Sequence, residues 1–131
     1  MNIRELESLP IVSLEISHET SYLYIENALL DSGSQSTLLP FDQLIANGIK
    51  PQPDAPMRRV MGIGDGEEWV MTMIIDELSI GDIKLNHAII QAGNTGCGYG
   101  FSAIVGYDFL KAVGAVVDFG RMSLFLSEGK R

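Results

Sequence analysis

The residues best suited to chemistry in this sequence form one short run, Asp31-Ser32-Gly33-Ser34. Apolar residues 28–30 lead the aspartate into this polar turn, and a hydroxyl-rich segment with an apolar anchor follows. The carboxylate is therefore held at a fixed point near apolar surroundings, and Gly33 lets other backbone approach it closely. A carboxylate in such a place is suited to general acid or base catalysis. The alternative is a turn that only ends a strand, because Asx turns are common there.

Other candidate sites carry weaker signals. A thiol nucleophile would pair Cys97 with His18 or His87, but no local signature joins them, and a structural or incidental cysteine is the simpler interpretation. Neither histidine is followed by a second ligand three or four positions later, so no metal and no cofactor are expected. The glycines of residues 62–66 precede no Gly-Lys-Ser or Gly-Lys-Thr run, so a hairpin tip is favoured over a phosphate loop.

The elements that must position these residues are mostly strands. Apolar and polar residues alternate, or short apolar runs end at turn signals every 8–12 residues, as in a β-barrel or sandwich. The sequence predicts about eight to ten short strands, the clearest at residues 10–17, 22–30, 58–63, 68–75, 77–80, 83–90, 115–118 and 122–126. Two short helices are expected, one from Asp42 to the Asn47-Gly48 stop and one over residues 107–113. No parallel βαβ rhythm is visible.

Composition limits the classes of function. The 131 residues predict one domain, residues 1–131, and 46% hydrophobic residues are enough for a packed core. The formal net charge of −8 argues against nucleic acid and against an anionic membrane surface as partners. The single cysteine indicates a reducing compartment, and neither a secretory signal nor a membrane span is visible. A cytoplasmic location is therefore expected.

Four motifs, in this order, resemble the retropepsin-like, or retroviral-type, aspartic proteases, including single-domain bacterial members. They are the turn at Asp31, a hairpin over residues 61–69 whose Gly64-Asp65-Gly66 tip is a strong turn signal, Ile104-Val105-Gly106 with its following helix, and closing strands at residues 116–119 and 124–126. The resemblance covers most of the chain. It implies a mostly β, closed barrel with one or two short helices and a flap hairpin.

The resemblance also implies a reaction. Aspartic proteases hydrolyse peptide bonds with two carboxylates that share one proton, one acting as base toward water and the other as acid. This chain has one such turn, and the aspartate after Gly106, Asp108, is not the catalytic partner in resembling domains. The second carboxylate is then expected from another copy, in a symmetric homodimer.

Roles for the neighbouring residues follow from the same resemblance. The Gly33 N–H points at the carboxylate, the Ser32 hydroxyl at the partner's loop, and the Ser34 hydroxyl at the outer carboxylate oxygen; ordinary turn capping is the alternative for both serines. Flap residues close over an extended peptide or protein substrate, with apolar side chains flanking the scissile bond, and Trp69 is either a pocket wall or core. The implied flap residues are Ile63, Gly64, Asp65 and Gly66.

Two departures from the family pattern keep other interpretations open. The glycine-rich stretch at residues 93–100 is longer than a minimal viral protease needs, and the N-terminus does not match the interleaved terminal strands of viral dimers. One alternative function is therefore a catalytically silent module of the same fold that dimerises or binds peptides. Another is an unrelated β-barrel with a chance Asp-Ser-Gly.

Overall fold

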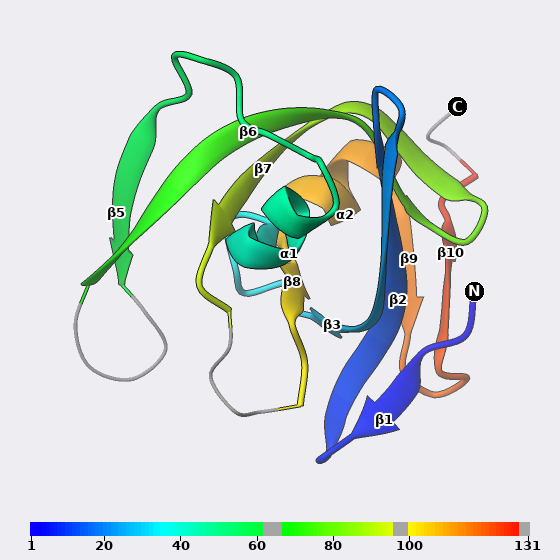
Figure 1. Ribbon diagram of the computed structural model, residues 1–131. Coiled ribbons are helices and arrows are strands. Elements are labelled where there is room, and N and C mark those ends of the chain that lie inside the picture. Colours follow the sequence, from blue (N-terminus) through cyan, green and yellow to red (C-terminus); the bar gives the residue numbers. More distant parts are fainter. Residues whose placement is uncertain (62–66, 96–99, 129–131) are drawn as a thin grey trace.

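The computed structural model describes residues 1–61, 67–95 and 100–128. Within these ranges the chain forms ten strands and two short helices (Figure 1). In chain order they are β1 (Arg4–Leu6), β2 (Leu9–His18), β3 (Ser21–Leu30), β4 (Leu38–Pro40), α1 (Phe41–Ala46), β5 (Met57–Met61), β6 (Glu67–Ile80), β7 (Ile83–Gly93), β8 (Ala103–Val105), α2 (Tyr107–Val113), β9 (Ala115–Asp118) and β10 (Ser123–Leu126).

Most strands belong to one sheet that closes on itself. The sheet has eight strands in the order β1-β2-β3-β8-β4-β7-β6-β5, and a further pairing of β2 with β6 closes a six-stranded barrel. The expectation of a mostly β, closed barrel with two short helices is confirmed. Figure 1 shows the β5–β6 hairpin extending from one side of the barrel and the β9–β10 hairpin lying at the other.

The barrel core follows from the alternation in the sequence. On β2, Val12, Leu14 and Ile16 are fully buried, as the period of two predicts. The helix α2 adds Phe109, which is also buried among the strands. Burial of each such side chain stabilises the folded state by about 1.5–3 kcal/mol. The core can therefore hold the turns and loops of a site in place.

Two short parallel pairings cross the barrel. In β3, Leu29 pairs with Ile104 of β8, and in β4, Leu39 pairs with Ala92 of β7. The sequence shows no parallel βαβ rhythm, and these two pairings were not predicted, because β4 and β8 are three residues each and lie far along the chain from their partners. A period of two says which face a residue takes and nothing about which strand it joins.

Two further differences from the expected strands have local causes. The predicted strands at residues 68–75 and 77–80 are one continuous strand, β6. The hairpin of β1 and β2 was not expected, because its tight turn uses Glu7 and Ser8 at φ angles of 53° and 62°. Such a turn is usually signalled by Asn or Gly, and neither is present here.

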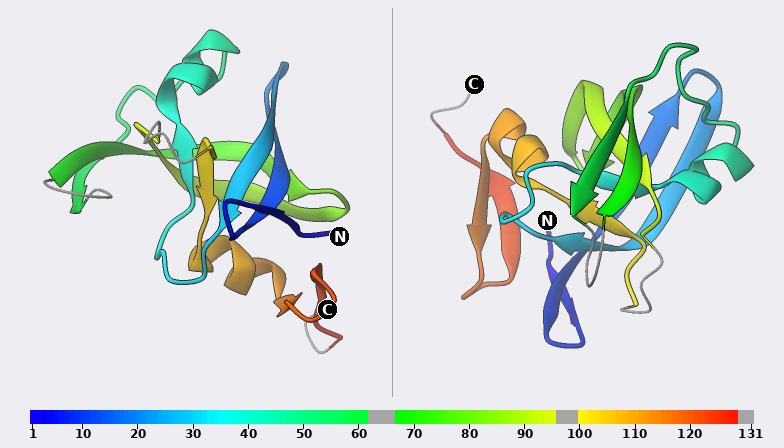
Figure 2. Two further views of the ribbon diagram at one scale, coloured as in Figure 1. Left: turned by 90° about the horizontal axis from the view of Figure 1, so that it is seen from below. Right: turned by 90° about the vertical axis from the view of Figure 1, so that its left-hand side faces the viewer.

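The first residues of the chain join β9 and β10 in a small terminal sheet (Figure 2). The Ile3 N–H donates to the Met122 carbonyl (2.8 Å), and the Leu124 N–H donates to the Met1 carbonyl (2.7 Å). The N-terminal residues of the chain therefore contact β9 and β10 of the same chain. Within the three described ranges, no helix is long and apolar enough to cross a membrane.

Candidate active site

Asp31 lies directly after β3, where the parallel pairing with β8 ends. Leu30 is opposite Val105, and the Asp31 N–H donates to the Val105 carbonyl (2.9 Å). The side chain is half-buried. The backbone of the aspartate is therefore fixed by a strand that the sequence identified through Ile104 and Val105.

The turn after Asp31 wraps around its carboxylate. The Gly33 N–H donates to Asp31 Oδ1 (3.0 Å), and the Ser34 N–H donates to the Asp31 carbonyl (3.1 Å). A Cβ atom on Gly33 would lie 3.2 Å from the same Oδ1, so glycine suits this close approach. Ser32 is exposed at the surface.

The Ser34 hydroxyl does not take the role implied by the resemblance. It donates to the carbonyl of Ser36 (2.8 Å), so its one proton is not available to the Asp31 carboxylate. The turn brings the Ser36 carbonyl within reach two residues further on, and a local bond of this kind is common for serine. Ser34 supports the turn and leaves the outer carboxylate oxygen of Asp31 to other donors.

Gly106 packs beneath this turn. A Cβ atom there would lie 2.4 Å from the Ser36 carbonyl oxygen and 2.9 Å from the Ser34 carbonyl oxygen. Both contacts are steric clashes with backbone atoms, which cannot move aside without distorting the turn. The next residue, Tyr107, donates its N–H to the Ser34 carbonyl (2.7 Å). The requirement for glycine at position 106 is therefore a close contact with the turn that follows Asp31.

Thr37 and Asp108 lock the turn to α2. The Thr37 hydroxyl donates to Asp108 Oδ1 (2.8 Å) and accepts from the Gly106 N–H (3.1 Å), while the Thr37 N–H donates to Asp108 Oδ2 (3.2 Å). Asp108 Oδ1 also accepts from the Phe109 N–H (2.7 Å). Both oxygens of Asp108 thus hold structure, which agrees with its exclusion as a catalytic partner. Sequence analysis missed Thr37, since nothing local marks its partners.

An apolar surface adjoins the turn on the face of β3 and β8 opposite the main core. Leu29, Ile104 and Leu38 are register partners across three strands, and register partners share a face. Phe101 joins them, almost fully buried, in a second apolar cluster separate from the barrel core. The sequence singled out Ile104 and the apolar run at residues 28–30, but three successive apolar residues do not show that Leu29 faces away from the main core.

The hairpin that was expected to be a flap is formed by β5 and β6, which pair from Met57 with Met71 to Met61 with Glu67. Its predicted tip, with Ile63, Gly64, Asp65 and Gly66, lies outside the described residues.

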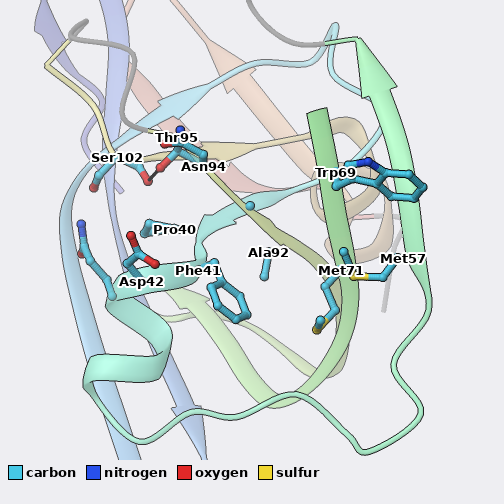
Figure 3. A pocket seen from close by; sticks show the side chains of 12 residues that line it. Pro40, Phe41, Asp42, Met57, Trp69, Met71, Ala92, Asn94, Thr95 and Ser102 are labelled. Carbon is cyan, nitrogen blue, oxygen red and sulfur yellow. Dashed lines mark hydrogen bonds between the residues drawn. The ribbon is translucent and has the colours of Figure 1, made fainter. Parts of the chain in front are cut away.

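A pocket of about 390 Å³ lies between the base of this hairpin and α1 (Figure 3). Trp69 and Met71 of β6 form one wall with Met57 of β5, and Phe41 of α1 faces them. Trp69 is 58% exposed, with the Arg59 guanidinium carbon 5.6 Å from the centre of its ring. Trp69 is therefore a pocket wall and not core. The complete lining is Pro40, Phe41, Asp42, Gln43, Met57, Trp69, Met71, Ala92, Gly93, Asn94, Thr95 and Ser102.

The other chemistries considered from the sequence find little support here. His18 Nδ1 accepts a hydrogen bond from the Asp76 N–H (3.2 Å), which occupies one ring nitrogen in a structural contact. Cys97 lies outside the described residues. Among the described residues, no group of three or more His, Cys, Asp or Glu side chains could hold a metal ion.

Comparisons with known proteins agree on the fold. No protein-family model matches the chain, and no curated protein matches it. Among solved structures, the retroviral protease-like domain of Ddi1 from Leishmania major is similar with a TM-score of 0.60 and 14% identity, over 90% of this chain and 89% of that one. A retropepsin-like aspartic protease from Rickettsia conorii gives a TM-score of 0.53 and 13% identity, over 82% and 86%. The chain therefore has the retropepsin-like fold.

Proposed function

We propose that this chain is an aspartic endopeptidase that works as a homodimer, with Asp31 and its twofold mate as the catalytic pair. The observation that carries the proposal is the placement of Asp31. Its turn is fixed by β8, by Gly106 and by the Thr37–Asp108 bonds, in a chain with the retropepsin-like fold. A carboxylate that only ended a strand would not need three separate supports from distant segments.

The chemistry needs two carboxylates. One Asp31 takes a proton from water while its mate donates a proton to the scissile carbonyl, and the two exchange roles as the intermediate collapses. Asp108 is committed to Thr37 and Phe109, so the second carboxylate comes from another copy. An isologous interface places the same residue from each chain at the twofold axis.

The substrate is an extended peptide with an apolar side chain beside the scissile bond. The apolar cluster next to Asp31 has the partly exposed Leu29 and Leu38 beside the buried Ile104, and burial of a large apolar side chain against them is favourable. The β5–β6 hairpin supplies a lid that closes over the peptide and excludes water.

Substitution of Asp31 by Asn tests the proposal. It keeps the size of the side chain and the acceptor for the Gly33 N–H, but it removes the shared proton. We expect cleavage of an unstructured protein to fall at least about 100-fold, measured by gel and mass spectrometry, whereas Asp54→Asn at an exposed position should leave it unchanged.

Mixing experiments test the dimer separately. An excess of Asp31→Asn chain should inhibit the wild type, because mixed dimers hold only one intact aspartate. Retained cleavage by the Asp31→Asn protein, or cleavage by a wild type that sediments only as a monomer, would contradict the proposal. If both proteins are inert while a dimer with paired Asp31 forms, the chain is instead a dimerisation or peptide-binding module.

A further inference from the structure

The segment between β7 and β8 contributes to two surfaces of the site. Near its start, Thr95 lines the pocket at the flap base, and near its end, Phe101 packs in the apolar cluster with Leu29 and Ile104. The Thr95 hydroxyl donates to the Ser102 carbonyl (2.5 Å), so the two ends of the segment are joined across its base. Whatever holds Ser102 therefore also sets the positions of Phe101 and Thr95.

Asn27 of β3 holds this segment with both its backbone and its side chain. Its carbonyl accepts from the Ser102 N–H (3.0 Å), and its Nδ2 donates to the Gly100 carbonyl (3.3 Å). Its remaining side-chain oxygen, Oδ1, accepts from Arg4 Nη2 (3.1 Å). Asn27 thus links β1, β3 and the segment before β8, four residues ahead of Asp31.

The N-terminal hairpin supports the segment at a second point. Gly100 has a left-handed φ of 87°, and a Cβ atom there would lie 3.0 Å from Leu6 Cδ2. Arg4 is anchored in turn, because its Nη1 donates to Ser13 Oγ (3.0 Å). Leu6 therefore lies directly against this segment, whereas Arg4, on the same strand β1, supports it through its hydrogen bond to Asn27.

We propose that Asn27, held by Arg4, is a positioning residue that sets which side chains the apolar surface beside Asp31 accepts. The inference rests on the proposed function and adds to it a determinant of specificity that touches neither the aspartate nor the substrate. We call the side-chain bonds of Asn27 to Gly100 and Arg4 the clamp. Without it, Gly100 loses its hydrogen bond to Asn27, and Phe101 is held less firmly in its position against Leu29 and Ile104. Large apolar side chains then lose their advantage over small ones.

The pattern of kinetic change distinguishes this role from a general loss of structure. Two peptides that differ only in Phe or Ala beside the scissile bond are compared with the wild type, Asn27→Ala and Arg4→Met. In both variants we expect KM for the Phe peptide to rise about tenfold while kcat for that peptide stays nearly unchanged. For the Ala peptide, both KM and kcat should stay nearly unchanged. Asn27→Asp retains the acceptor for Arg4 but loses the donor to Gly100, and it should show the same loss of discrimination.

Gln52→Ala is the matched control. Gln52 is another surface amide with two bonds to distant backbone, from its Nε2 to the Ile74 carbonyl and from the Ile74 N–H to its Oε1. The Gln52→Ala substitution should not change the ratio of kcat/KM between the Phe and Ala peptides. An Asn27→Asp protein that behaves like the wild type, or equal losses for both peptides in Asn27→Ala, would overturn the inference.

A structural measurement separates failure of this inference from failure of the proposed function. Amide hydrogen exchange at Ser102 should become faster in Asn27→Ala and Arg4→Met, and it should stay unchanged in Gln52→Ala. If exchange changes but the wild type cleaves nothing, the clamp stands and the protease proposal fails. Unchanged exchange at Ser102 in both clamp variants overturns the clamp, whatever the activity.

Discussion

The hydroxyl of Thr37 joins two segments that meet only in the folded chain. It is 1% exposed, and it connects the carboxylate of Asp108 to the N–H of Gly106. Both partners start α2, while Thr37 belongs to the chain that leaves the Asp31 turn. The buried Thr37 hydroxyl therefore fixes the chain after the Asp31 turn relative to the start of α2.

Thr37→Val should lower the free energy of unfolding by about 1–3 kcal/mol, because the valine keeps the shape but leaves the Gly106 N–H without its acceptor. The measurement is urea unfolding followed by circular dichroism. Thr20→Val, at an exposed turn, is the control and should change stability by less than about 0.5 kcal/mol. A loss as small as that of the control at Thr37 would mean that the network is not cooperative.

Some residues of the site can be predicted from their immediate sequence neighbours, and others cannot. The positions of Asp31 and Gly106 could be predicted, because each belongs to a short run with a recognisable neighbour. Thr37, Asn27 and Phe101 could not be, since their roles depend on segments that lie far along the chain. The Ser34 hydroxyl was expected to donate to the Asp31 carboxylate but donates to the Ser36 carbonyl. Two acceptors compete for one hydroxyl, and only the folded turn decides between them.

At the scale of elements, the base of the β5–β6 hairpin carries an exposed aromatic wall. Trp69, Met57 and Met71 line the pocket opposite Phe41 of α1, and Trp69 is the single tryptophan of the chain. An exposed tryptophan over a pocket is typical of a binding surface. Its emission therefore reports on the pocket alone.

Titration of the Asp31→Asn protein with an apolar peptide should shift the emission of Trp69 to shorter wavelength as the ring leaves water. Trp69→Ala should weaken the binding of that peptide about 5–10-fold, because one aromatic contact is lost. Its unfolding free energy should change by less than about 0.5 kcal/mol, because the ring is largely exposed. Strong destabilisation, or a titration without spectral change, would show that the pocket is not part of the binding surface.

Elements were predictable where a strand is long and half-buried. The alternation on β2 and β3 was sufficient to place these two strands, and α2 covers the residues 107–113 at which a helix was expected. The strand β4 was not predicted as such, because three residues show no period, and β1 was missed because its turn uses Glu7 and Ser8 without a glycine. Closure of the barrel is a property of pairing, so it came from the resemblance and not from the pattern.

The whole molecule carries a formal charge of −8, and this affects the proposed dimer. Two such copies repel each other through solvent, and salt shortens the range of that repulsion from about 30 Å at 0.01 M to about 8 Å at 0.15 M. We therefore expect the dimer dissociation constant to fall severalfold between these two salt concentrations. Sedimentation velocity over a range of protein concentrations measures it.

Specific activity should follow the same equilibrium, falling on dilution and recovering with added salt. The Asp31→Asn protein is a useful comparison, because its dimer lacks the negative charge that the proton-sharing pair of carboxylates holds at the axis, and this should reduce the effect of salt on assembly. A dimer that weakens as salt rises would mean that ion pairs across the interface outweigh the net repulsion.

The parallel pairing of β3 with β8 also orders events during folding. The β2–β3, β5–β6 and β6–β7 hairpins join strands that are neighbours in the sequence, and such contacts form early. Residues 28–30 must wait for residues 103–105, since closing so long a loop is slow. A chain still emerging from the ribosome therefore exposes Asp31 long before its turn takes shape. If the proposed function holds, the late pairing of β8 delays hydrolysis until almost the whole domain is present.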